Sequence, residues 1–149
     1  RIKMNIRGIN IDHIDAIKKL MIDIFSKEPW NDTWADEQLH LYVSELIDNK
    51  NSLSFGLFEN DNMIGIALGH IKHWYEGTEY WIDEFGVISE KQKCGIGTKF
   101  LAEIEKALED KGVIYIALLT ERTVPAYHFY KNNGFDEKEE TGFFVKRVY

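Results

Sequence analysis

The sequence has almost none of the residues that build disulfide scaffolds or stiff linkers. Among its 149 residues there is one cysteine, Cys94, and there are two prolines, Pro29 and Pro125. A single thiol excludes a disulfide scaffold, and it is typical of a reducing compartment such as the cytoplasm. Every apolar run is much shorter than the roughly 20 residues of a membrane helix, so no membrane association is expected.

Positive charge is also scarce, because 18 Lys and Arg residues face 25 Asp and Glu residues, a net charge of −7. A nucleic-acid binder needs clustered Lys and Arg, so nucleic acid is disfavoured as a partner, whereas a cationic small molecule is compatible with this balance. Hydrophobic residues make up 44% of the chain and charged residues 29%, as in ordinary globular proteins. The length favours one domain over residues 1–149.

Apolar spacing predicts the elements of the first half. Helical periodicity covers residues 11–27, with Asp12 as the cap, and a Thr33–Asp36 capping pair predicts a second helix. Strands are expected at residues 4–8, 53–57, 63–74 and 80–87. The connections between the last three strands are too short for crossover helices, which indicates an antiparallel meander.

The second half predicts a parallel crossover followed by a terminal hairpin. The expected elements are a helix over 95–111, a strand over 113–119 buried on both faces, a helix over 125–133 and strands over 135–140 and 143–148. The fold class is therefore α+β (mixed α/β). We expect a mostly antiparallel mixed sheet of about seven strands with a central parallel pair, flanked by about four helices.

A polar loop with two glycines, Gly95 and Gly97, lies between the predicted strand 80–87 and the helix that follows. The first N–H groups of a helix lack intrahelical partners, and glycines let a ligand approach the backbone, so this loop suits a pyrophosphate. A plain helix start with permissive glycines is the alternative. The spacing is neither that of a P-loop nor that of a dinucleotide fingerprint, which would need a glycine in place of Phe100.

The segment 125–135 follows the predicted strand 113–119, so we expect it beside the glycine loop, at the carboxyl ends of adjacent parallel strands. Tyr130 in this segment is either a core aromatic residue or a proton donor.

Two segments resemble motifs of the GNAT superfamily, the acetyl-coenzyme-A-dependent N-acetyltransferases. The run from Gln92 to Gly97 is similar to the family's Q/R-x-x-G-x-G/A loop, and the run from Tyr130 to Phe135 is similar to its Y-x-x-x-G-F segment. The order of elements also matches, so the resemblance covers essentially the whole chain. The stretches 28–31 and 74–77 resemble bacterial members grouped with aminoglycoside N-acetyltransferases.

The resemblance implies acetyl-coenzyme A as the cofactor. The loop would hold the pyrophosphate, and the end of the preceding strand would pair with the pantetheine arm. The implied contacts are Phe85, Gly86, Val87, Gln92, Lys93, Cys94, Gly95, Ile96, Gly97, Thr98, Thr123 and Tyr130. Gln92 stands where arginine is common in the family, and Thr123 where many members carry asparagine.

Transfer to an amine needs a base, because a primary amine with a pKa near ~10 is mostly protonated at pH 7. Asp83 and Glu84 are candidates, and strand alternation would let only one of them face the cleft. The resemblance favours Glu84 as the base and implies that Tyr130 protonates the departing thiolate. Cys94 lies in the phosphate loop, so an acyl-enzyme on it is not expected.

Aromatic and acidic residues in two loops suggest a place for the acceptor amine. They are Trp30, Asp32, Trp34, Trp74, Tyr75 and Glu76, with Asp83 as a further candidate. Simple loop packing is the alternative, although carboxylates and aromatic faces suit a cation. His70 and His73 would point to opposite faces of a strand, so no metal site is expected.

These observations predict an acetyl-coenzyme-A-dependent N-acetyltransferase that acts on a primary amine of a small cationic substrate, aminoglycoside- or polyamine-like. A protein or peptide N-acetyltransferase and a non-catalytic coenzyme-A-binding regulatory module are the alternatives. A plain interaction domain with structural glycines is a third. Either a monomer or a homodimer is compatible with the sequence.

Overall fold

The computed structural model describes residues 3–149, which form two compact units divided between Leu119 and Thr120. The first unit contains five strands: β1 (Met4–Ile9), β2 (Ser52–Glu59), β3 (Asn62–Trp74), β4 (Gly77–Val87) and β5 (Val113–Leu118). Its helices are α1 (Ile14–Phe25), α2 (Asp36–Ile47) and α3 (Ile96–Asp110), with short 3-10 helices η1 (Ile11–His13) and η2 (Ser89–Lys91). The α+β class is confirmed.

The five strands form one sheet in the order β1-β2-β3-β4-β5. The pairings of β2 with β3 and of β3 with β4 are antiparallel, as the predicted meander requires, and β1 also pairs with β2 in antiparallel fashion. Strands β4 and β5 are parallel, and α3 connects them in the sequence. The prediction of seven strands was wrong, and the parallel pair lies at one side of the sheet, not at its centre.

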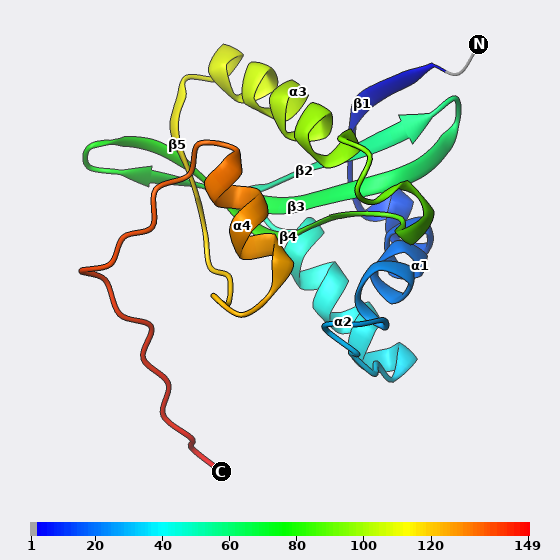
Figure 1. Cartoon of the computed structure of the whole chain (residues 1–149), viewed down its shortest axis with the longest axis horizontal. Coiled ribbons are helices and arrows are strands. Elements are labelled where there is room, and N and C mark those ends of the chain that lie inside the picture. Colours follow the sequence, from blue (N-terminus) through cyan, green and yellow to red (C-terminus); the bar gives the residue numbers. More distant parts are fainter. Residues whose placement is uncertain (1–2) are drawn as a thin grey trace. The chain divides into compact units, whose positions relative to one another are not determined.

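Helices cover both faces of this sheet (Figure 1). One buried cluster joins α1 and α2 to Ile66 and Leu68 of β3. A second cluster joins α3 to Ala67 of the same strand. The two clusters follow from alternation along β3, because neighbouring strand residues point to opposite faces.

Two predicted helix caps are replaced by others. Asn10, not Asp12, caps the first helical segment, and its side chain accepts a hydrogen bond from the Asp12 N–H at 2.9 Å. The cap residue of α2 is Ala35, which has no side-chain acceptor, so the Thr33–Asp36 capping pair does not form. Asp36 instead pairs with Lys18 of α1 at 2.9 Å.

Strand β5 is less buried than its apolar sequence predicts. Ile114 is 54% exposed and Tyr115 58% exposed, so this strand is not buried on both faces. The reason is its position, because within residues 3–119 the strand pairs only with β4.

The second unit contains α4 (Pro125–Asn132), which begins with Pro125 in its first turn. Gly134 follows with a φ of 88°, the left-handed conformation expected of a glycine that ends a helix. Residues 135–148 do not form the predicted hairpin. Their apolar residues Phe143, Phe144 and Val145 are consecutive, so the segment lacks the alternation that gives a strand one buried face.

Candidate active site

The glycine loop leaves the start of α3 open to an anion. Gly95 is the N-cap residue with a φ of 81°, and it supplies no side chain to cap the helix. The amides of Ile96, Gly97 and Thr98 belong to the first helical turn, where N–H groups lack intrahelical acceptors. No acidic residue occurs in this turn, so the helix dipole there is not neutralised.

Side chains from the rest of the first unit hold the loop in place. The Asp23 carboxylate of α1 accepts a hydrogen bond from the Ser89 N–H at 2.8 Å, and Lys91 pairs with Glu59 at 3.1 Å. The Gln92 Nε2 donates to the Val87 carbonyl at 3.1 Å, which ties the loop to the end of β4. These contacts position the loop without using the amides of Ile96, Gly97 and Thr98 at the start of α3.

Two lysines and the cysteine of this loop face solvent. Lys93 (φ 63°) and Lys99 are exposed and lie on either side of the Gly95 cap. The Cys94 thiol is also exposed, and it donates to the Lys91 carbonyl at 2.8 Å. The lysines add positive charge beside the helix start, which favours a diphosphate over a neutral group.

Strand β4 continues toward this loop beyond the end of its pairing with β5. Their parallel ladder ends at the pair Ile82 and Leu118, whereas β4 continues to Val87. The residues beyond the ladder are those for which a pantetheine contact is predicted, Phe85, Gly86 and Val87. Gly86 also has a packing reason to be glycine, because a Cβ there would lie 2.8 Å from the Ile24 side chain.

Glu84 lies on the same stretch of β4 and is bound by a residue of α2. The Tyr42 hydroxyl donates to Oε2 of Glu84 at 2.5 Å. The Tyr42 ring stacks on Trp34, with centroids 5.2 Å apart. Helix α2 thus contributes directly to the carboxylate that the sequence analysis chose as the base.

A β-bulge breaks the alternation that the sequence analysis assumed for the two acids. Leu68 of β3 pairs with Glu84 and Gly69 pairs with Ile82, so Asp83 is an extra residue on β4. Asp83 pairs with His70 at 2.9 Å. His70 is two residues from Leu68, which packs in the cluster with α1 and α2, so both acids lie on that face. The prediction that they point to opposite faces was wrong.

The acidic neighbourhood changes how Glu84 and Tyr42 hold their protons. Burial raises the pKa of Glu84 to about 7; the charges of Asp32 and Asp83 add to this rise, and the Tyr42 hydrogen bond opposes it. Burial and the Glu84 charge raise the pKa of Tyr42 well above its usual value, so Tyr42 remains a donor. A carboxyl with a pKa near 7 is suited to accept a proton at neutral pH.

The predicted acceptor residues do not gather in one place. Asp32 lies close enough for its charge to act on Glu84, and Trp30 packs edge-on against Phe25 at 5.2 Å. Trp74 and Tyr75 are at the β3–β4 turn and are 54% and 83% exposed. Seven residues of β4 separate that turn from Glu84, roughly 23 Å along a strand, so one small amine would not contact both groups.

Two candidate residues belong to the second unit. Tyr130 is buried in α4, and its ring packs edge-on against Phe129 and Phe135, with centroids 5.3 Å apart in each pair. Thr123 lies in an exposed turn before this helix. The packing of the Tyr130 ring explains an aromatic residue there, and its role as an acid stays a prediction.

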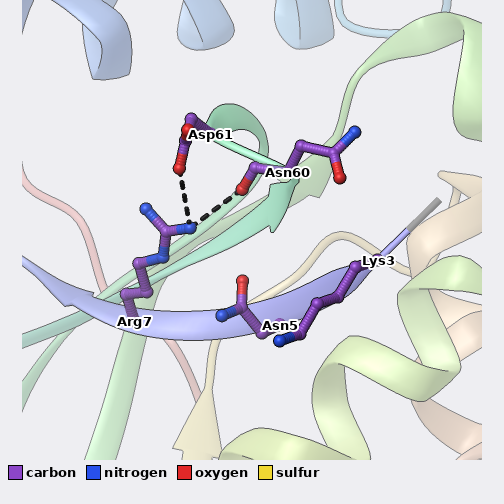
Figure 2. A pocket seen from close by; sticks show the side chains of 5 residues that line it. All are labelled: Lys3, Asn5, Arg7, Asn60 and Asp61. Carbon is purple, nitrogen blue, oxygen red and sulfur yellow. Dashed lines mark hydrogen bonds and ion pairs between the residues drawn. The ribbon is translucent and has the colours of Figure 1, made fainter. Parts of the chain in front are cut away.

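A separate hollow lies at the start of β1, lined by Lys3, Asn5, Arg7, Asn60 and Asp61 (Figure 2). Arg7 pairs with Asp61 at 3.3 Å and donates to the Asn60 carbonyl at 2.8 Å. The charge of Arg7 is therefore already paired with that of Asp61. The hollow shares no residue with the glycine loop or with the group of Asp32, Asp83 and Glu84. Among residues 3–149 no group of His, Cys, Asp and Glu could hold a metal ion, and none of their helices could cross a bilayer.

The sequence analysis missed the parts played by Tyr42, Trp34 and His70. The second helix predicted in the first half contains Tyr42, but the sequence pattern predicts no partner for its hydroxyl. A buried tyrosine hydroxyl normally finds a hydrogen-bond partner, so this residue carried a signal that periodicity alone does not use. Its identity as a partner of Glu84 depends on how α2 packs against the sheet.

Comparison with known proteins agrees with this geometry. Residues 14–135 match the model of the acetyltransferase (GNAT) family. This chain belongs to the GNAT family. It is therefore an acyltransferase, and the acyl donor of the family is acetyl-coenzyme A. No curated protein sequence matches the chain.

Solved structures with the same fold cover nearly the whole GNAT chain. The aminoglycoside N-acetyltransferase AAC(6')-Iy, in complex with CoA, is 20% identical, with a TM-score of 0.76 over 99% of this chain and 97% of that one. A possible acetyltransferase from Clostridium difficile 630 is 17% identical, with a TM-score of 0.82 over 98% and 99%. An aminoglycoside acetyltransferase from an uncultured soil metagenomic sample, in complex with sisomicin, is 16% identical, with a TM-score of 0.76 over 98% and 97%.

The residues of the first unit fit acetyl-coenzyme A. The uncapped start of α3 offers amides and the exposed Lys93 and Lys99 offer charge for a diphosphate, while β4 extends past its ladder with β5. This region is therefore suited to two parts of the cofactor, its diphosphate and its extended arm.

Proposed function

We propose that this GNAT protein transfers an acetyl group from acetyl-coenzyme A directly to a primary amine of a small cationic substrate, such as an aminoglycoside or a polyamine. The observation that supports this most strongly is the partly buried Glu84, with a pKa of about 7, beside the acidic Asp32 and Asp83. Such a site attracts an ammonium group and can remove a proton from it. The neighbours that are named as aminoglycoside acetyltransferases agree with this substrate class.

In this proposal each part of the site has one task. Acetyl-coenzyme A supplies the acetyl group as a thioester. The amides of residues 96–98 bind its diphosphate, and the end of β4 orients its arm. Glu84 first takes a proton from the ammonium group, which frees the lone pair of the nitrogen. The neutral amine then forms the N–C bond at the thioester carbon, the C–S bond breaks without an acyl-enzyme, and the nitrogen loses its second proton to solvent. Tyr130 returns a proton to the sulfur of the leaving group, a role that rests on the family resemblance.

The proposal also covers the setting of the reaction. The family match runs across both compact units, which supports the prediction of a single catalytic domain. The single thiol, Cys94, is compatible with a reducing compartment, so we place the reaction in the cytoplasm.

A panel of amines tests the substrate class. Thiol release from acetyl-coenzyme A is measured with an aminoglycoside, with spermidine, with a lysine-containing peptide and with a monoamine of similar size that carries no second charged group. We expect the highest kcat/KM for the polycationic small molecules. A preference for the peptide would favour the protein N-acetyltransferase alternative. Cofactor binding without thiol release from any amine would favour the non-catalytic alternative.

A further inference from the structure

The hydroxyl of Tyr42 and the carboxylate of Glu84 form a hydrogen bond between two elements that are far apart in sequence. Tyr42 is on α2 and Glu84 on β4, and the bond length is 2.5 Å. The bond engages Oε2 of Glu84. Hydrogen bonds to a charged carboxylate are short and strong, and they restrict its rotation.

We propose that Tyr42 is a positioning residue that orients the Glu84 carboxylate and sets the pH at which Glu84 accepts a proton, a role that rests on the proposed function of Glu84 as the base.

The surroundings of Tyr42 suit such a role. Its ring stacks on the Trp34 ring at an interplanar angle of 25°. This stacking restricts the movement of the ring that carries the hydroxyl. The indole N–H of Trp34 is buried and has no acceptor among the described residues. The contact of Trp34 with Tyr42 is therefore ring packing, without a hydrogen bond from the indole.

The charged groups around Glu84 and the Tyr42 hydrogen bond have opposite effects on the pKa of Glu84. Asp32 precedes α2, Asp83 is next to Glu84 on β4, and His70 on β3 pairs with Asp83. The two aspartates favour the protonated form of Glu84, whereas the Tyr42 hydroxyl favours the carboxylate. Burial raises the pKa of Glu84 most, the Tyr42 hydrogen bond lowers it, and the two aspartates raise it further. Loss of the Tyr42 hydroxyl should therefore raise this pKa, and loss of an aspartate charge should lower it.

The test is the variant Tyr42→Phe, which removes the hydroxyl and keeps the ring. We expect the pH at which Glu84 titrates to rise by about one pH unit, the size of one charged hydrogen bond. At pH 6.5 kcat/KM for the amine should then fall about tenfold, with much of the loss recovered at high pH. The KM for acetyl-coenzyme A should not change.

Two further variants show the sign of the effect. Asp32→Asn removes a negative neighbour from an exposed position, so the titration of Glu84 should move to lower pH. Trp34→Leu removes the stacking partner but keeps the Tyr42 hydroxyl, so it should move the titration upward by less than Tyr42→Phe does. Tyr80→Phe is the matched control, because it removes a tyrosine hydroxyl that donates to the Leu53 carbonyl at 2.8 Å and leaves the Tyr42 bond intact.

The titration is followed by ¹³C NMR of the glutamate carboxyls, with the Glu84 signal assigned by its loss in Glu84→Gln. This readout does not depend on catalysis. An unchanged Glu84 titration in both Tyr42→Phe and Trp34→Leu would overturn the inference. If the NMR titration moves while the pH–rate profile does not, Glu84 is not the base, and the catalytic role of Tyr42 is overturned together with the role of Glu84, whereas the amine panel tests the acetyl transfer itself.

Discussion

The glycine loop and the carboxylate site around Glu84 are assembled in different ways. The loop places its amides within a few consecutive residues, 95–98, and needs distant side chains only as anchors. The carboxylate site brings together Asp32, Tyr42 and Glu84 from three separate segments. A backbone site can therefore be recognised as a motif, whereas a side-chain site depends on how a helix packs on a sheet.

Glu84→Gln gives the largest expected effect and acts on the carboxylate site alone. Loss of a general base typically lowers turnover by about 10²–10⁴-fold. We therefore expect kcat to fall by at least ~100-fold with the affinity for coenzyme A unchanged, and the remaining activity to follow the titration of the amine itself. Steady-state kinetics from pH 6 to 9 and cofactor titration measure the two quantities.

Glu79→Gln on the same strand is a suitable control for that experiment. Glu79 accepts a hydrogen bond from the Trp81 indole at 3.1 Å and has no contact with Tyr42. This variant should keep normal turnover. Full activity of Glu84→Gln at every pH would show that the carboxylate site does not supply the base, and the contrast with the cofactor-binding glycine loop would then be lost.

Gly97→Leu should weaken cofactor binding at the glycine loop and leave the carboxylate site unchanged. A bulky side chain in the first turn of α3 would block the approach of a diphosphate, and the loss of one or two charged hydrogen bonds weakens binding by roughly 10–100-fold. Isothermal titration with coenzyme A measures this change, and the NMR titration of Glu84 should stay as it is. Gly8→Leu is the matched control, since a Cβ at Gly8 meets nothing within 4 Å. Equal affinity for coenzyme A in the two variants would contradict diphosphate binding at the start of α3.

The stability of the protein should also depend on pH through Glu84. In the native state Glu84 holds its proton up to a pKa of about 7, whereas its ordinary value is 4.5. Between these values the native state binds more protons than the unfolded state, so this group makes the free energy of unfolding fall as pH rises. The cost is fully present above pH 7 and amounts to at most about 3 kcal/mol.

Urea unfolding of the wild type and of Glu84→Gln at pH 5 and pH 8 isolates this contribution. The variant should gain stability relative to the wild type at pH 8 more than at pH 5. An equal difference at both pH values would show that Glu84 titrates near its ordinary pKa, and the carboxylate site would then lose its special proton affinity.

Much of the fold was predictable because periodicity reports which face of an element is buried. The meander of β2, β3 and β4 and the helices α1 and α3 follow their apolar patterns closely. Residues 135–148 were misread as two strands, because aromatic and branched residues favour strands without ensuring a ladder partner. The capping of α2 was also misread, since Asp36 pairs with Lys18 of α1 instead.

The candidate site was predictable only in part, for a similar reason. The open amides after Gly95 could be inferred from two glycines at a helix start. The common face of Asp83 and Glu84 could not, because it depends on a bulge that places one extra residue in β4. A single inserted residue reverses the alternation on which strand predictions rest.

The amino-acid order alone determined where the chain turns, which helix begins with uncapped amides, and which residues carry carboxylates, because these are properties of neighbouring residues. Tertiary structure decided which carboxylate is buried, which tyrosine binds it and which acids surround it. Proton affinity depends on solvent exclusion and on charges brought close through space, and neither quantity is set by distance along the chain.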